Sequence, residues 1–121
     1  MIRTHKDLEV WKLSMGLVTD VYKLTSLFPK EELYGLTRQI RESAVSVPSN
    51  ISEGAARQTT KEFIHFLYYA TGSLSELETQ LLISKELGFA TSVEGILNLI
   101  LKEKNLLSRL ILKLKNKKSI S

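Results

Sequence analysis

Apolar residues along this chain recur at intervals of three and four, and no segment shows the alternation of apolar and polar residues that is typical of a β-strand. The pattern predicts four amphipathic helices and an all-α fold. In the first helix the apolar residues form two adjacent stripes, which predicts a broad buried face. One stripe holds Leu8, Trp11, Met15, Val18 and Tyr22, and the other holds Leu17, Val21, Leu24 and Phe28. We expect Pro29 to end this helix.

The next two helices each carry a single stripe in heptad-like phase, whereas the fourth again carries two. The stripe of the second helix comprises Leu36, Ile40, Ala44, Val47, Ile51 and Ala55, and that of the third comprises Phe63, Leu67, Ala70, Leu74, Leu77 and Leu81. The fourth helix has Val93, Leu97, Ile100, Leu107, Ile111 and Leu114 on one stripe, and Ile96, Leu99, Leu106 and Leu110 on its neighbour. Stripes of this kind predict helices that pack side by side around one core.

Signals at the helix ends support this division. Residues 59–62 and 91–94 each have the S/T-x-x-E spacing of a capping box, so we expect the third and fourth helices to begin there. Gly88 follows the third stripe, where a left-handed C-terminal cap favours glycine, and Phe89 can add the accompanying apolar contact. The short gaps between helices make sequential neighbours antiparallel. The sequence therefore predicts an antiparallel up-down-up-down four-helix bundle over residues 1–114.

Pro48 lies inside the second helix, and the apolar stripe keeps its phase on both sides of it. A proline there removes a backbone donor and leaves the carbonyl of Ala44 without its usual partner, which costs about 3 kcal/mol unless another group compensates. Small polar residues crowd the same place, namely Ser43, Ser46, Ser49, Asn50 and Ser52. We expect their side chains, or a water that they hold, to satisfy that carbonyl. The helix is thus predicted to be kinked at Pro48, continuous, and to end near residues 54–56.

The second stripes of the first and fourth helices exceed what a solitary four-helix bundle can bury. Exposed together, they would form an apolar patch larger than monomers usually carry. We therefore expect these residues to contact another subunit, and the candidates are Leu17, Leu24, Leu99, Leu106 and Leu110. Periodicity alone predicts a dimer as readily as a ring.

The net charge of +4 is unevenly distributed along the 121 residues. Residues 1–101 hold ten Lys and Arg against twelve Asp and Glu, whereas residues 102–121 hold seven against one, which gives −2 and +6. Residues 115–121 are read as a basic C-terminal tail. Its candidate contacts with phosphate are Lys115, Lys117 and Lys118, preceded by Lys113. The alternative is that these lysines serve only solubility.

Composition and motifs argue against catalysis. The chain has no cysteine, which rules out thiolate chemistry and is compatible with a reducing compartment. No apolar run is long enough to span a bilayer and no secretory leader is evident, so we expect a cytoplasmic protein without membrane contact. The serines around Pro48 have no nearby base, and Glu62 and His65 form an E-x-x-H step that lacks a second copy. We expect no catalytic residue, metal or cofactor.

Three stretches together resemble a known family. They read DLEVWKLSMGLVTDVYKLTSLFP, YGLTRQIRESAVSVPSNISEGAAR and KEFIHFLYYATGSLSELETQLLISKELGF. The chain resembles, over about residues 4–114, the four-helix-bundle proteins encoded in intervening sequences of bacterial 23S ribosomal RNA genes, which are similar in turn to the accessory variability determinant of diversity-generating retroelements. The resemblance implies a homopentameric ring without known enzymatic activity. For the retroelement relatives it also implies binding to nucleic acid and to a reverse transcriptase.

One position departs from the family pattern, because Glu42 stands in QIRES where a second basic residue is expected. This weakens a basic patch on the second helix. The candidate nucleic-acid-binding residues that remain outside the tail are Arg38, Arg41, Arg57 and Lys61. If the second and third helices pack antiparallel, Arg57 and Lys61 share one end of the bundle, and the other two lie a helix length away. The alternative is that all four are solvated charges or partners of nearby glutamates.

The sequence thus favours a non-enzymatic, homo-oligomeric interaction module. Its expected partners are further copies of itself, RNA or DNA, and a reverse transcriptase. A second hypothesis is a structural or orphan product of a ribosomal RNA intervening sequence that binds no nucleic acid, and an enzyme is the third.

Overall fold

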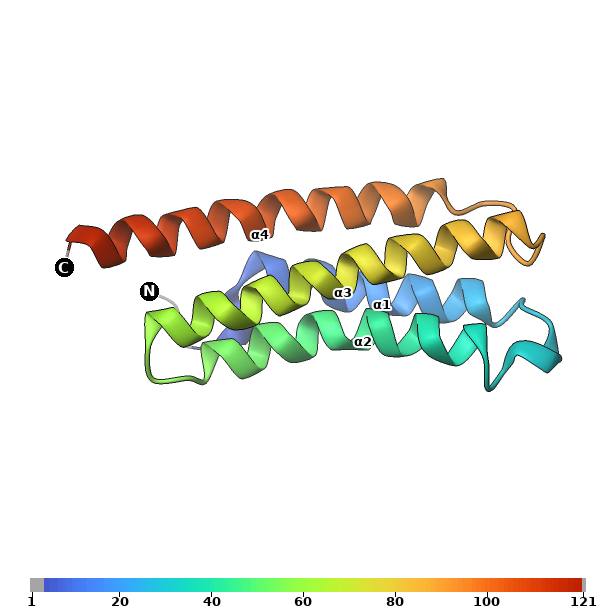
Figure 1. Ribbon diagram of the computed structural model, residues 1–121, viewed down its shortest axis with the longest axis horizontal. Helices are drawn as coiled ribbons and strands as arrows, with labels where there is room; N and C mark the ends of the chain where they lie inside the picture. Colours follow the sequence, from blue (N-terminus) through green and yellow to red (C-terminus); the bar gives the residue numbers. More distant parts are fainter. Residues whose placement is uncertain (1–3, 121) are drawn as a thin grey trace.

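The computed structural model describes residues 4–120, with the backbone alone for residues 118–120. Within this range the chain forms four α-helices and two short 3-10 turns and no strand, which confirms the all-α prediction. The helices are α1 (Glu9–Thr25), α2 (Leu36–Ala55), α3 (Thr60–Glu86) and α4 (Glu94–Ile120), and the turns are η1 (His5–Asp7) and η2 (Lys30–Glu32). Figure 1 shows the four helices lying lengthwise beside one another, joined by short connections.

Each α-helix packs against two of the other three. The contacting pairs are α1 with α2, α2 with α3, α3 with α4, and α4 with α1. Side-chain contacts fix how α3 and α4 are aligned, because Lys104 Nζ lies 3.1 Å from Glu78 Oε1 and Lys115 Nζ lies 2.8 Å from Tyr68 Oη. The end of α4 therefore lies beside the beginning of α3, and its last turns extend past that helix (Figure 1).

The core is formed by the stripes predicted for the second and third helices together with one stripe from each of the other two. Its fully buried large side chains include Leu17, Val21, Ile40, Val47, Ile51, Leu67, Leu74, Leu77, Leu81, Ile100 and Leu107. Removal of this apolar surface from water is the main favourable term in folding. The stripes of α2 and α3 are confirmed as core positions.

The structure corrects the division of stripes in α1. Leu17 is 0% exposed and Val21 is equally buried, so their stripe belongs to the core, whereas Met15 and Tyr22 on the other stripe are exposed. A side chain without exposed surface cannot contact a neighbouring subunit, and the prediction that Leu17 lies at an oligomer interface is wrong. Leu24 is only partly exposed and packs against the same core. Periodicity identified both stripes correctly but carries no information on which of them faces inward.

The second apolar stripe predicted for the fourth helix also packs against the core of the same subunit. Leu99, Leu106 and Leu110 are partly buried and pack against the core, while Ile96 is fully within it. The core face of α4 contains one acidic residue that the stripes passed over: Glu103 is 0% exposed, between Ile100 and Leu107.

Several predicted helix ends are confirmed. The Thr59 hydroxyl accepts a hydrogen bond from the Glu62 backbone N–H at the start of α3, at 3.1 Å. Gly88 has φ +78, the left-handed conformation expected of the cap. Phe89 follows it and packs against Phe28, with ring centroids 6.0 Å apart.

Other ends differ from prediction. The first helix ends at Thr25, before Phe28, where the Thr25 hydroxyl donates to the carbonyl of Val21. The fourth begins at Glu94, whose carboxylate accepts a hydrogen bond from Lys85 instead of closing a capping box on Thr91. It also continues to Ile120, so residues 115–120 of the predicted basic tail form the last turns of α4.

α2 is continuous through Pro48 and ends at Ala55, as predicted. The small polar side chains near the proline bond differently from expectation. The hydroxyls of Ser46 and Ser52 donate to the carbonyls of Ser43 and Ser49, and the Asn50 amide donates to the carbonyl of Ser46. These bonds anchor the polar side chains to the backbone of their own helix, and none of the three accepting carbonyls is that of Ala44, which Pro48 leaves without its usual partner.

Candidate nucleic-acid interface

The connection between α2 and α3 is shaped by a close approach of the two helices. Gly54, in the last turn of α2, is buried, and a Cβ atom placed there would lie 2.6 Å from Cβ of Phe66. Only glycine allows α3 to come this near at this position. Four residues after Ala55 the Thr59 cap starts α3, so Arg57 in the connection and Lys61 in the first turn of α3 are held near the Phe66 ring.

A hollow of about 390 Å³ opens at this connection. Its lining residues are Arg57, Lys61, Glu62, His65, Phe66 and Tyr69. The Arg57 guanidinium lies 4.8 Å from the centre of the Phe66 ring, a cation–π contact. The Tyr69 ring stands edge-on to two neighbours, with centroids 5.5 Å from Phe66 and 6.3 Å from His65 and interplanar angles of 87° and 89°. The hollow therefore combines two cations with aromatic rings set at right angles.

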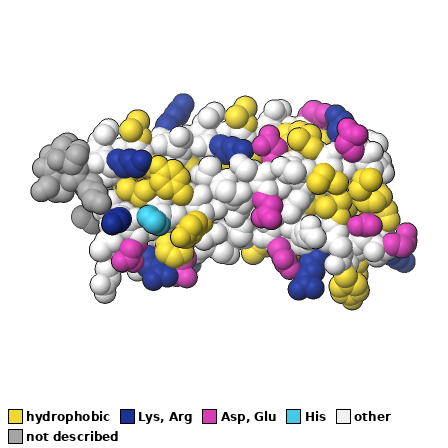
Figure 2. All heavy atoms as spheres, viewed as in Figure 1, with side chains coloured by type: hydrophobic (Ala, Val, Ile, Leu, Met, Phe, Trp, Pro, Cys, Tyr) yellow, Lys and Arg dark blue, Asp and Glu magenta, His cyan; other side chains and the backbone are white. Residues whose placement is uncertain are grey.

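The last turns of α4 bring further lysines to the same end of the molecule. The Lys115 ammonium donates to the Tyr68 hydroxyl at 2.8 Å, and Tyr68 is adjacent in sequence to Tyr69 of the hollow. Lys113 and Lys117 are exposed on the same stretch of α4, and the side chain of Lys118 lies outside the described part of the chain. Figure 2 shows basic, acidic, apolar and histidine side chains intermixed at the end where α3 begins.

We call this surface the basic-aromatic end. It comprises Arg57, Lys61, His65, Phe66, Tyr68, Tyr69, Lys113, Lys115 and Lys117. The fold thus brings together two sets of predicted nucleic-acid-binding residues that lie far apart in the sequence.

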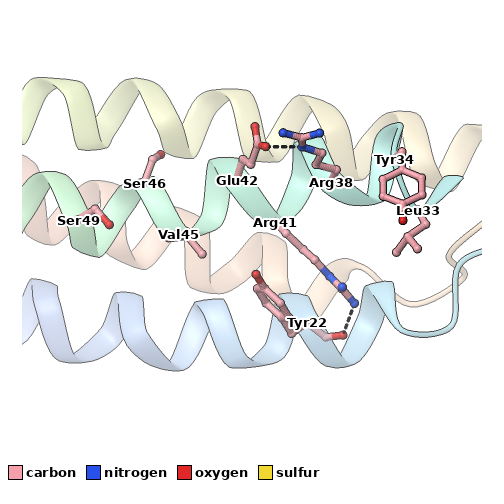
Figure 3. A pocket seen from close by; sticks show the side chains of 9 residues that line it. All are labelled: Tyr22, Leu33, Tyr34, Arg38, Arg41, Glu42, Val45, Ser46 and Ser49. Atoms are coloured by element: carbon pink, nitrogen blue, oxygen red, sulfur yellow. Dashed lines mark hydrogen bonds and ion pairs between the residues drawn. The ribbon is translucent and has the colours of Figure 1, made fainter.

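The other predicted arginines lie near the opposite end of α2, in a groove of about 680 Å³ between α1 and α2 (Figure 3). Arg38 Nε lies 2.8 Å from the carboxylate of Glu42, the residue that departs from the family pattern. Arg41 donates from Nε to the Thr25 hydroxyl at 2.8 Å, and its guanidinium lies 4.4 Å from the centre of the Tyr22 ring. Both arginines therefore have partners within the chain.

The two pairs of predicted basic residues lie apart along α2. Arg57 and Lys61 share one hollow, and Arg38 and Arg41 share a groove near the other end of the helix. The residues that would hold a metal do not gather in the same way. Glu62 and His65 line the hollow together, but in the part of the chain that the structure describes no three His, Cys, Asp or Glu side chains are placed to hold an ion.

Comparison with protein families decides what kind of chain this is. The sequence model of one family, described as 23S rRNA-intervening sequence protein, matches residues 6–113. The chain belongs to this family. A comparison with curated proteins gave no match. Among the described residues of this intervening sequence protein, no helix has both the length and the apolar character needed to cross a membrane.

Sequence reasoning missed the aromatic part of the intervening sequence protein's basic-aromatic end. Phe66, Tyr68 and Tyr69 lie beside the α3 stripe that packs into the core, and Tyr68 and Tyr69 are exposed. Their position outside the apolar stripe could have been recognised from the sequence. Large aromatic side chains are costly to leave in water, so several of them outside a buried stripe indicate a binding surface. Their convergence with Arg57 and Lys115 depends on how α2 and α4 pack against α3, which periodicity alone does not specify.

Proposed function

We propose that this intervening sequence protein is a non-enzymatic, homo-oligomeric helical module that binds RNA through its basic-aromatic end. The observation that carries the proposal is the gathering of Arg57 and Lys61 with Lys113, Lys115 and Lys117 at one end of the molecule. Clustered cations on one surface attract the phosphate backbone and release its counterions. In the proposal the protein acts in the cytoplasm, where RNA is present. The reducing conditions there are compatible with a chain that has no cysteine and so needs no disulfide.

The charges at this end are available to a ligand. Arg57 makes only a loose ion pair, since its guanidinium lies 3.8 Å from Glu53 and both side chains are about half exposed. Exposed pairs of this kind contribute little and are readily exchanged for a phosphate contact. Lys115 contacts a neutral hydroxyl, so its charge is not neutralised by that bond. Arg38 also forms an exposed ion pair, with Glu42 at 2.8 Å, but it lies near the opposite end of α2, away from the clustered cations.

RNA binding is tested by fluorescence anisotropy with a labelled RNA at low salt. Arg57→Ala and Lys61→Ala are each expected to weaken binding severalfold, because each removes a phosphate contact. Arg38→Ala is the matched control and is expected to change the affinity little. Absence of binding by the wild-type chain would favour the second hypothesis, a structural product without affinity for nucleic acid.

The oligomeric part of the proposal needs a different face from the one that the sequence suggested. We place the subunit contact on the α1–α2 face, where Met15, Val18, Tyr22 and Val45 are exposed or half-exposed. Tyr22 and Val45 line one groove, and Val18 and Tyr22 line a second that continues it along α1. An antiparallel up-down-up-down bundle with such a face on two adjacent helices is suited to a closed ring, for which the family resemblance implies five members.

Val45→Glu tests this face. It places a charge on an exposed apolar position, so dissociation of the oligomer is expected without loss of helical circular dichroism. The matched control is Leu101→Glu, which changes an exposed leucine on α4. Mass is measured by analytical ultracentrifugation at micromolar concentration. A Val45→Glu protein that keeps the oligomeric mass, or dissociation by the control alone, would contradict the assigned face.

A reverse transcriptase remains a proposed protein partner on the strength of the resemblance. Co-purification of the two proteins from cells that express both is the direct test.

A further inference from the structure

The hollow at the α2–α3 connection contains more than a phosphate site requires. Two cations are enough to hold a phosphate, yet three aromatic or imidazole rings line the same 390 Å³ space. Tyr69 is 55% exposed, so its ring is accessible to a ligand. A ring held at the rim of a concave surface beside cations is the arrangement that proteins use to stack bases.

The fold fixes the position of Phe66, and the Tyr69 ring lies edge-on beside it. Phe66 packs against Gly54 at the close approach of α2 and α3 and lies under the Arg57 guanidinium. Tyr69 stands at 87° to Phe66 and at 89° to His65, so the rings form a corner and not a flat platform. A planar group stacked on Tyr69 would therefore lie nearly perpendicular to the rings of Phe66 and His65. Preformed rings of this kind lose little conformational freedom when a ligand binds.

The charges around the corner are arranged for a nucleotide. Arg57 and Lys61 supply positive charge for a phosphate. Glu62 lines the same hollow; its carboxylate repels a phosphate but accepts hydrogen bonds from the amino groups of a base edge. The hollow therefore contains groups suited to the nucleic-acid backbone and a group suited to a base edge.

We propose that the hollow binds one unpaired nucleotide of a single-stranded nucleic acid, with its base stacked on Tyr69 and its phosphate at Arg57 and Lys61. A base in a duplex has both faces covered by its neighbours and cannot stack on a protein ring. The inference rests on the proposed RNA-binding function and makes it more specific, because it names the class of strand and the group that is recognised.

The test separates bases from phosphates by using two labelled strands of about ten nucleotides, which lies within the usual size range of such sites. One is an ordinary single strand, and the other has the same backbone with the bases removed at abasic positions. Stacking predicts that the abasic strand binds at least about fivefold more weakly. A duplex of the same length is expected to bind no better than the abasic strand.

Tyr69→Leu provides the second arm. It removes the ring and keeps an apolar side chain at a largely exposed position, so the fold is retained. We expect it to weaken binding of the ordinary strand at least about fivefold and to leave binding of the abasic strand unchanged, because the two changes remove the same interaction. The matched control is Leu87→Ala, which alters an exposed apolar side chain just beyond the opposite end of α3.

The outcomes distinguish the two proposals. Equal affinity for both strands, or an equal loss on both with Tyr69→Leu, would overturn the stacking site and leave RNA binding through phosphates intact. A wild-type chain that binds neither strand in a salt-dependent manner would overturn the RNA-binding function and the stacking site together.

Discussion

At the scale of single residues, Glu103 is the position where the composition of the core is most unexpected. It is 0% exposed on the core face of α4, and both of its carboxylate oxygens lack a hydrogen-bond partner in the described structure. Burial disfavours the charged form and raises the pKa of the Glu103 carboxyl to about 8. The side chain is therefore mostly protonated at neutral pH, which makes its burial far less costly than that of a carboxylate.

Glu103 makes stability depend on pH. The unfolded chain releases this proton near pH 4.5 and the folded chain near pH 8, so the contribution of Glu103 to the free energy of unfolding is largest at low pH and falls as pH rises between these values. The slope is up to about 1.4 kcal/mol per pH unit from this one group. Guanidinium unfolding at fixed protein concentration, at several pH values from 5 to 8.5, measures it.

Glu103→Gln is the control, because glutamine does not titrate and all other groups are unchanged. The free energy of unfolding of this variant is expected to fall less with rising pH than that of the wild-type chain. The difference between the two proteins is expected to change mainly below pH 8. Parallel curves for the two proteins would show that Glu103 is already ionised in the folded state.

Gly54 offers a second prediction at this scale. Gly54→Ala places a methyl group 2.6 Å from Cβ of Phe66, so α2 and α3 must move apart. Overpacking of this kind typically costs about 1–3 kcal/mol. Gly72→Ala on α3 is the matched control, because nothing lies within 4 Å of its added Cβ. The control is expected to gain up to about 1 kcal/mol from helix propensity.

Thermal or guanidinium unfolding compares the two glycine variants. Equal stability for both would mean that the close approach at Gly54 is easily relaxed. It would also remove the argument that this glycine positions Phe66 and Arg57.

At the scale of helices, the sequence was informative wherever a single apolar stripe was present. The stripes of α2 and α3 are buried as predicted except at their ends, where Leu36, Ala55 and Phe63 are partly exposed, and α2 passes through Pro48 without interruption. α1 has two apolar stripes, and the one that faces the core was predicted to face another subunit. The spacing of apolar residues shows which residues share a face of the helix but not which face is turned towards the core. Leu17 is the clearest case, since its environment is decided by the packing of α2 and α4 around it.

Glu103 illustrates a second limit of pattern reading at this scale. Its position fits the phase of the core stripe between Ile100 and Leu107, but its side chain is normally charged. Only the packed structure shows that it is enclosed. The basic-aromatic end is a third case, because Arg57 and Lys115 become neighbours of α3 aromatics through contacts between helices.

Pro48→Ala tests the role of the proline in α2. Alanine restores a backbone donor within the helix, and the difference in helix propensity is about 3 kcal/mol. The loss of two buried methylene groups costs about 1.6 kcal/mol. We therefore expect a more stable protein whose helical circular dichroism does not fall. Lower stability would show that the ring of Pro48, or a bend that it imposes, is required for packing against the neighbouring helices.

At the scale of the whole molecule, the two ends of the bundle differ in chemistry. One end joins the α2–α3 connection to the last turns of α4 and gathers cations and aromatic rings. The other holds arginines that are already partnered by Glu42 and Thr25. In the proposed ring, polarity of this kind would leave one face for nucleic acid and the apolar α1–α2 face for contact between subunits. The central claim is that RNA binds at the basic-aromatic end.

The dependence of RNA affinity on salt, compared between two double variants that lose the same charges, tests this claim most directly. Arg57→Ala/Lys61→Ala removes an arginine and a lysine at the basic-aromatic end, and Arg38→Ala/Lys30→Ala removes the same pair of residue types at the opposite end. Each phosphate contact contributes about 0.7 to the slope of log affinity against log salt for a single strand. The first variant is predicted to have a slope shallower by about 1.4 and the second an unchanged slope, whereas equal slopes, or the reverse order, would contradict the account.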